Sequence, residues 1–213
     1  LKIENEKIVG IIDNLEEKLS GKLPVTREEL LFLANSWGRL GNFDAKASNN
    51  QILMIDKCDS KECYDLSKLD TSKITDMSSI FRNSNFNGDI SNWNTSNITN
   101  MEWMFFKAEK FNSDISNWDT SNVTSMERMF SFAINFNQSV NFDTSKVTNM
   151  MSMFCNAYNF NQNISSWNFD NIINCDYMFD NAKAFLDKYN NSDPLSNHTD
   201  NIKDWVNLNR DKM

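Results

Sequence analysis

A five-fold internal repeat constrains this chain more than any other feature of its 213-residue sequence. Its clearest marker is an Asp or Asn that is followed in most copies by Thr-Ser and recurs at intervals of 24 or 25 residues. The markers begin at Asp70, Asn94, Asp119, Asp143 and, in a degenerate form, Asn168. A regular period of this length is typical of proteins that repeat and stack one structural unit.

Apolar residues occupy fixed places in every copy, while most other places vary. A β-branched residue stands four places after the marker, and a Met, or Cys in the last copy, stands seven places after it. Two Phe columns follow, at Phe81, Phe105, Phe130, Phe154 and Phe179 and at Phe86, Phe111, Phe136, Phe160 and Phe185. One short unit cannot bury such a stripe alone, so neighbouring units must stack. The pattern predicts a solenoid.

The order of residues within one unit predicts strand, turn and short helix. Residues 114–118 are typical of a short strand, and residues 119–122 of a turn built on Asp and Ser side chains. The i, i+3, i+4, i+7 spacing of a helix face follows at Met126, Met129, Phe130 and Ala133. We therefore predict an α/β solenoid of about five strand/short-helix coils, with an α-helical N-terminal cap and a C-terminal helical cap.

The sequence on either side of the repeats predicts those caps. We expect an N-terminal helical cap and lead-in strand over 1–64, the repeat solenoid over 65–190, and a C-terminal cap over 191–213. Thr26 and Glu29 have the spacing of a capping box that opens a helix, and residues 51–55 are typical of a strand. A final amphipathic helix is predicted on Ile202, Trp205, Val206 and Leu208.

Charge and composition exclude several classes of partner. The formal net charge of −8 argues against nucleic acid or an anionic membrane surface, because both favour Lys and Arg patches. The sequence contains no run of 18 apolar residues that could cross a membrane. With one His in the chain, His198, we expect no metal site, no cofactor and no catalytic residue.

One segment of the repeat resembles a known family. The string Ile-Ser-Asn-Trp-Asp-Thr-Ser-Asn-Val-Thr-Ser-Met-Glu-Arg-Met-Phe, residues 115–130, is similar to the repeat of the BspA-like leucine-rich-repeat surface proteins of bacteria. The resemblance covers roughly residues 65–190 and implies a leucine-rich-repeat-like solenoid that is exported to the bacterial cell surface or secreted. The protein is thus a lipoprotein candidate. Adhesion is proposed for some relatives, and the resemblance implies no enzymatic activity.

Two columns in which the same residue recurs from repeat to repeat, one of Asn and one of Met, have structural explanations. The Asn column could form a polar binding strip, but we expect each Asn to bond the backbone of its own coil and the next one. The Met column could suggest a soft metal, but it shares a face with Phe and Ala and is typical of a core. The Asn column comprises Asn87, Asn112, Asn137 and Asn161.

Aromatic and aliphatic residues at variable places are the candidates for partner binding. Other copies carry Ser, Arg, Lys, Asn or Asp there, so these residues either form an exposed patch or pack against a cap. The candidates are Trp103, Phe106, Phe132, Ile134, Tyr158 and Tyr177. A local disulfide between Cys58 and Cys63 is expected if the protein is exported.

We therefore predict a non-enzymatic surface or secreted repeat protein that acts as a binding or adhesion scaffold for a protein or glycan. The alternative is an architectural spacer within a larger surface protein, without a ligand of its own. A glycan-processing enzyme is less favoured, because no acid/base pair stands apart from the repeat. The sequence favours a monomer.

Overall fold

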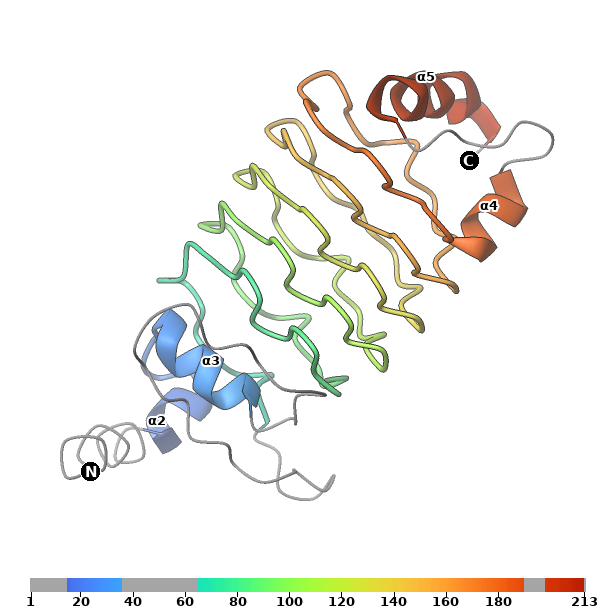
Figure 1. The fold of residues 1–213 in the computed structure, drawn as a ribbon. Helices are drawn as coiled ribbons and strands as arrows, with labels where there is room; N and C mark the ends of the chain where they lie inside the picture. The colour runs from blue at the N-terminus through green and yellow to red at the C-terminus, as the bar shows by residue number, and fades with distance from the viewer. Residues whose placement is uncertain (1–14, 36–64, 190–197, 213) are drawn as a thin grey trace, which may run out of the picture.

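A computed structural model describes residues 15–35, 65–189 and 198–212, and it shows a stack of five coils between helical ends (Figure 1). Helices α2 (Leu15–Leu19) and α3 (Arg27–Asn35) lie at the N-terminal end of the stack. Helices α4 (Lys183–Tyr189) and α5 (Thr199–Asn209) lie at its other end, and α5 continues into a 3-10 turn, η1 (Arg210–Lys212). We number the coils 1 to 5 from their first residues, which are Asp70, Asn94, Asp119, Asp143 and Asn168.

The predicted α/β class is wrong. Between residues 65 and 189 the only helix is α4, and the described residues contain isolated parallel bridges in place of strands. The bridges join one residue per coil, Asp76 to Asn100, Asn100 to Ser125, Ser125 to Asn149 and Asn149 to Asn174. The chain is therefore not a leucine-rich-repeat-like solenoid of strand/short-helix coils.

The expected strand at 114–118 fails because local hydrogen bonds bend it. The Asp114 carboxylate accepts the N–H of Ser116 at 2.9 Å, and the N–H of Trp118 donates to the carbonyl of Ile115 at 3.2 Å. Such Asx and four-residue turns compete with an extended backbone. The side-chain pattern of a strand is present, but the backbone forms a bend.

The expected helix at Met126 to Ala133 is replaced by two consecutive turns. Met129 donates its N–H to the carbonyl of Met126 at 3.2 Å, and Ala133 donates to Phe130 at 3.0 Å. The third residues of these turns, Arg128 and Phe132, have φ of 51° and 59°. A positive φ at the third position is typical of type II turns. The same double turn recurs in every coil, and its four-residue period places the same residues inward as a helix would.

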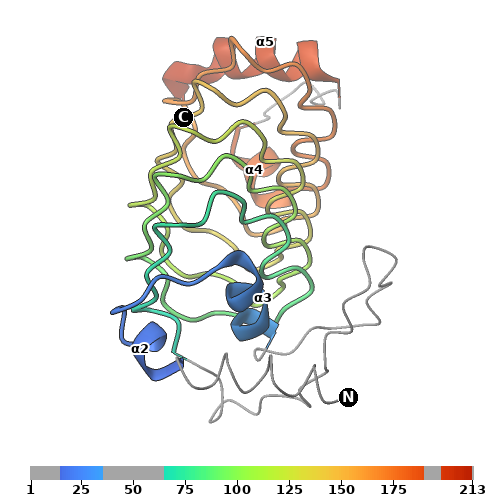
Figure 2. The same cartoon turned by 90° about the vertical axis from the view of Figure 1, so that its left-hand side faces the viewer.

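The double turns join neighbouring coils through their backbones. In coil 2 the N–H groups of Met101, Trp103, Phe105 and Lys107 donate to carbonyls of coil 3 at 2.8–3.0 Å. Every coil from 1 to 4 donates to its successor in this way, so alternate N–H groups of each double turn point towards the C-terminal end of the stack. Figure 2 shows the successive coils stacked one above another between α2 and α3 at one end and α5 at the other.

The core consists of stacked side chains that repeat from coil to coil. Rings of the first Phe column lie 5.5–5.9 Å apart between neighbouring coils, with planes within 9° of parallel. Within coil 2, Phe105 stacks on Phe111 at 3.8 Å. Both Phe columns are buried throughout, as are the inward Met residues of the double turns and Cys175. Burial of this repeated stripe supplies the main stabilisation of the stack.

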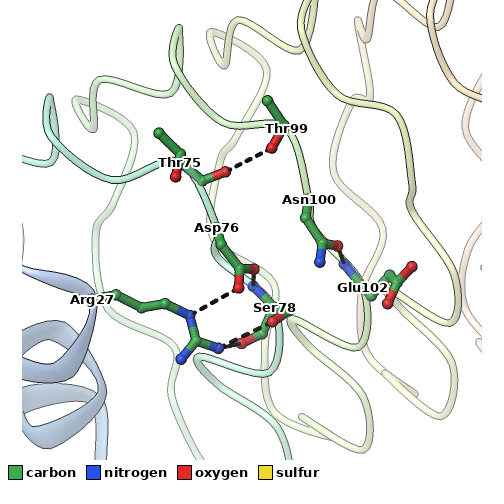
Figure 3. A network of polar contacts seen from close by, with 7 residues as sticks. All are labelled: Arg27, Thr75, Asp76, Ser78, Thr99, Asn100 and Glu102. Atoms are coloured by element: carbon green, nitrogen blue, oxygen red, sulfur yellow. Dashed lines mark hydrogen bonds and ion pairs between the residues drawn. The ribbon is translucent and has the colours of Figure 1, made fainter.

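The N-terminal end of the stack needs donors for the carbonyls of coil 1, because no coil precedes it among the described residues. Arg27 of α3 supplies them: its Nη2 donates to the Ser78 carbonyl at 2.8 Å, and its Nε lies 3.2 Å from the Asp76 carboxylate (Figure 3). The predicted capping box at the start of α3 is confirmed. Thr26 N–H donates to the Glu29 carboxylate at 2.9 Å, and Glu29 N–H donates to Thr26 Oγ1 at 3.3 Å.

The C-terminal end needs an acceptor on the double-turn side, and α5 supplies it. The N–H of Cys175 donates to Thr199 Oγ1 at 2.9 Å, where earlier coils use a carbonyl of the next coil. Lys203 also donates to the carbonyl of Ile172 in coil 5 at 3.0 Å, and Arg210 donates to the carbonyl of Ser165, near the end of coil 4, at 2.6 Å. Ile202 and Val206 of this helix are buried, whereas Leu208 is 79% exposed and does not belong to the packed face.

Several sequence-based expectations lie outside the described residues. These are the strand at 51–55, the pair Cys58 and Cys63, and the part of the predicted N-terminal helical cap that precedes residue 15.

Candidate partner-binding face

The outward residues of the double turns form one continuous surface, which we call the double-turn face. Each coil contributes four positions to it, the second and third residues of each turn. In coil 2 these are Glu102, Trp103, Phe106 and Lys107, and in coil 4 they are Met151, Ser152, Cys155 and Asn156. The inward residues of both coils are alike, so the face is the part of the stack in which the coils differ most.

Coils 1 to 3 carry an aromatic–cationic cluster on this face. We define it as Arg82, Trp103, Phe106, Lys107, Arg128 and Phe132. Trp103 and Phe106 lie 4.8 Å apart between ring centroids, and Phe106 and Phe132 lie 5.8 Å apart edge to face. These three rings are half-buried. The structure therefore brings three of the six predicted partner-binding residues together.

Three cations cover the rings. The guanidinium groups of Arg82 and Arg128 lie 4.8 Å and 4.5 Å from the Trp103 ring centroid. The Lys107 ammonium lies 5.4 Å from the Phe106 ring and 5.5 Å from the Phe132 ring. At these distances each cation is attracted to the ring faces, by about 0.5–1 kcal/mol at exposed sites. The contacts run from coil 1 to coil 3 and fix the side chains relative to one another.

Four members of the cluster adopt a backbone conformation that their side chains disfavour. Trp103, Lys107, Arg128 and Phe132 have φ between 51° and 59°. Outside Gly, the left-handed region is favoured mainly by Asn and Asp, and a bulky residue there loses about 1 kcal/mol. At the place of Lys107 and Phe132 the other coils carry Asn, and at the place of Trp103 and Arg128 two other coils carry Ser; these residues are Asn83, Asn156, Asn181, Ser79 and Ser152. The stability of the coil therefore does not by itself explain why aromatic and cationic residues occupy these left-handed positions.

Acidic residues beside the cluster have partners of their own. Glu127 pairs with Arg128 at 3.2 Å and accepts a hydrogen bond from Asn149 Nδ2 at 3.0 Å. Glu102 accepts a hydrogen bond from Ser125 Oγ at 2.6 Å. The cluster thus forms a region of mixed but predominantly positive charge on an acidic chain.

The other predicted partner-binding residues lie apart from the cluster. Tyr158 and Tyr177 are 43% and 46% exposed, and Ile134 is half-buried. Among the described residues, no ring contact joins either tyrosine to the cluster. Tyr177 lies on the double-turn face in coil 5, whereas Ile134 and Tyr158 follow the double turns of coils 3 and 4.

Sequence reasoning missed Arg82, Lys107 and Arg128 as members of the site. The signal was present, because each occupies the same place in its repeat as Trp103, Phe106 or Phe132 occupies in a neighbouring one. Arg82 aligns with Phe106, Arg128 with Trp103, and Lys107 with Phe132. A search for aromatic residues alone leaves out cations at equivalent positions.

The Asn column lies on a bend outside this face. The N–H of each following Asn donates to the preceding side-chain oxygen, from Asn112 to Asn87, Asn137 to Asn112 and Asn161 to Asn137, at 2.8–3.0 Å. These bonds satisfy backbone groups between coils.

The marker column forms Asx turns, as its turn-forming composition predicts. Each Oδ1 accepts the N–H two residues later at 2.7–3.1 Å. Hydrogen bonds from the Ser121 side chain and backbone lower the pKa of Asp119, and Ser145 lowers the pKa of Asp143 in the same way.

The two cysteines of the repeats are free thiols in different environments. Cys155 is half-buried on the double-turn face, and Cys175 is buried in the Met column. Burial raises the pKa of Cys175 to about 11 and raises that of Cys155 as well. Among the described residues, no three His, Cys, Asp or Glu side chains come together as a metal site would require.

Stacked coils with uniform inward residues and variable outward ones define a repeat protein with one distinctive surface. The chain matches the family described as "Mycoplasma protein of unknown function, DUF285" over residues 49–142 and 133–211. These segments cover more than half of the chain, which therefore belongs to that family, and two successive matches agree with its internal repetition. Comparisons with curated proteins and with solved structures gave no match. In the described residues, no helix is both long and apolar enough to span a bilayer.

Proposed function

We propose that this protein is a non-enzymatic binding or adhesion scaffold, and that the double-turn face of coils 1 to 3 is its binding surface. The stack serves as a rigid support, and the aromatic–cationic cluster makes the contact. Trp and Arg are the residues most often found at the energetic centres of protein interfaces, so a protein partner suits the cluster well.

The observation that carries this proposal is the choice of side chains at left-handed positions. Trp103 and Phe132 occupy left-handed places, where Asn would stabilise the coil better. The Phe106 ring contacts both of their rings, and three cations lie over the rings. Residues that are held in unfavourable conformations tend to gather at functional sites. Arginines that are already stacked on a ring also lose less freedom when they bind carboxylates.

The proposed location is the bacterial cell surface or the secreted fraction. Its support is the resemblance of residues 115–130 to the repeats of BspA-like surface proteins. The absence of enzymatic activity is part of the same proposal, and its support is that the acidic residues of the cluster are engaged with Arg128, Ser125 and Asn149.

An array of matrix proteins and glycans tests the proposal. Saturable binding by the intact protein, lost when Trp103→Ala and Phe106→Ala are combined, is the expected result. Tyr158→Ala is the matched control, because it removes an exposed ring outside the cluster and should leave binding intact. Absence of binding at micromolar concentration would favour the architectural spacer. Hydrolysis of a glycan on the array would contradict the non-enzymatic assignment.

A further inference from the structure

Charge is distributed unevenly along the double-turn face. Coil 1 presents Arg82 as its one charged residue on this face, and coil 5 presents Asp176 and Asp180. Coils 2 and 3 each present one cation and one acid, Lys107 with Glu102 and Arg128 with Glu127. Coil 4 has no charged residue among its four positions. The face therefore has a net positive charge in coil 1, no net charge in coils 2 to 4, and a net negative charge in coil 5.

Side-chain size is distributed unevenly in the same direction. Coil 2 presents Trp103 and Phe106, whereas the same two positions of coil 4 carry Ser152 and Cys155. Ser152 is 6% exposed, so it lies low in the surface. Coil 4 is thus flatter than coil 2.

We propose that a second copy of this chain docks on the double-turn face, antiparallel to the first. The two-fold axis runs along the coil direction through coil 3. This pairs coil 1 with coil 5, coil 2 with coil 4 and coil 3 with itself, and keeps each residue opposite the same turn position in the partner copy. The proposal rests on the proposed function in taking this face to bind protein, and it names the partner.

The pairing places opposite charges against each other at the ends of the face and large side chains against small ones between them. Arg82 lies opposite Asp180, because each is the second residue of the second turn in its coil. By the same reasoning Trp103 lies opposite Ser152 and Phe106 opposite Cys155, so bulky side chains meet small ones. At the centre coil 3 faces itself, so Glu127 and Arg128 lie opposite the same residues of the partner copy, and each Arg128 lies one place along the chain from the Glu127 of the other copy. Self-complementarity of this kind is what a two-fold interface requires.

The dimensions of the face predict a weak dimer. Five coils spaced by about 4.8 Å extend about 24 Å, and the eight residues of a double turn reach at most about 26 Å. The resulting area, at most ~600 Å² per copy, is below the ~800 Å² of a standard stable interface. We therefore expect a dissociation constant in the micromolar range or weaker, with self-association that decreases as salt is added.

Sedimentation velocity of the full chain, from low micromolar to several hundred micromolar protein, tests this proposal. A monomer–dimer equilibrium is expected, and Arg82→Glu or Asp180→Lys alone should weaken dimerisation at least tenfold by placing like charges opposite each other. The double variant Arg82→Glu with Asp180→Lys restores opposite charges and should recover the dimer. Recovery would also show that the single variants fold. Asp187→Lys, on the exposed surface of α4, is the control and should leave dimerisation unchanged.

Two results would overturn the dimer. One is a protein that stays monomeric at every concentration, and the other is a dimer that the single charge reversals do not weaken. If a monomeric protein still binds another ligand through Trp103 and Phe106, the second copy is excluded as the occupant while the proposed function stands. If the protein dimerises as expected but binds nothing on the array, the adhesion function fails and the second-copy assignment stands.

Discussion

Coils 2 and 4 have the same backbone conformation but present very different side chains on the double-turn face. Both place Met, Met, Phe and Ala inward through two turns, and both donate alternate N–H groups to the next coil. Outward, coil 2 presents Trp103, Phe106 and Lys107, and coil 4 presents Ser152, Cys155 and Asn156. The comparison teaches that inward residues fix the coil, while the outward residues are left to determine what the coil binds.

The sharpest test of this division compares two adjacent phenylalanines of coil 2. Phe105 is fully buried and stacks on Phe81, Phe111 and Phe130, so Phe105→Ala should destabilise the protein by about 3–5 kcal/mol. Phe106→Ala is the matched control and should lose about 1 kcal/mol, mainly from its cation contacts. Urea unfolding measures both, and equal losses would show that the outward position is also part of the core.

Removal of one Asn from its column tests the bonds between coils. Asn112→Ala takes away the oxygen that accepts the Asn137 N–H and should lower the free energy of unfolding by about 1 kcal/mol. Asn117→Ala, at an exposed turn of the same coil, should change it by less than about 0.5 kcal/mol. If the two variants unfold alike, the column does not stabilise the stack.

A substitution at a left-handed outward position should stabilise the protein. Tyr177 has φ of 58° and is exposed, so Tyr177→Asn should raise the free energy of unfolding by about 0.5 kcal/mol in dilute protein. Tyr158→Asn is the control, because Tyr158 is similarly exposed without a positive φ. A loss of stability in Tyr177→Asn would mean that the tyrosine makes a contact worth more than the backbone strain.

The smallest expected effect is a pH dependence that differs between coils. Since hydrogen bonds lower the pKa of Asp119 in the folded state, its contribution is present above the ordinary pKa of about 4 and is lost as pH falls further. Asp119→Asn should therefore flatten the acid limb of a stability curve slightly. Asn94→Asp should steepen it, because coil 2 would gain the same titrating turn. Thermal melting between pH 3 and pH 6 measures both changes.

Sequence reasoning succeeded where each residue acts within its own repeat. The inward columns, the Asx turns at the markers and the capping box of α3 follow from residue type and spacing, and the structure contains all of them. It failed at the backbone of Met126 to Ala133. A helix and two type II turns both place i, i+3, i+4 and i+7 on one side, so the apolar pattern cannot distinguish them.

The candidate site was only partly accessible from the sequence. Trp103, Phe106 and Phe132 are recognisable as apolar residues at variable places, and they do lie together. Their contacts with Arg82, Lys107 and Arg128 depend on how closely coils 1, 2 and 3 stack, and that distance cannot be read from the sequence.

The sequence by itself determined the period, the number of coils and the identity of the buried columns, because an apolar stripe must be buried whatever backbone carries it. Only the tertiary structure decided the conformation between those columns. Neighbouring coils accept the N–H groups that a helix would have used within itself, and this makes the left-handed turns possible. The same stacking brings cations and rings from three repeats onto one face.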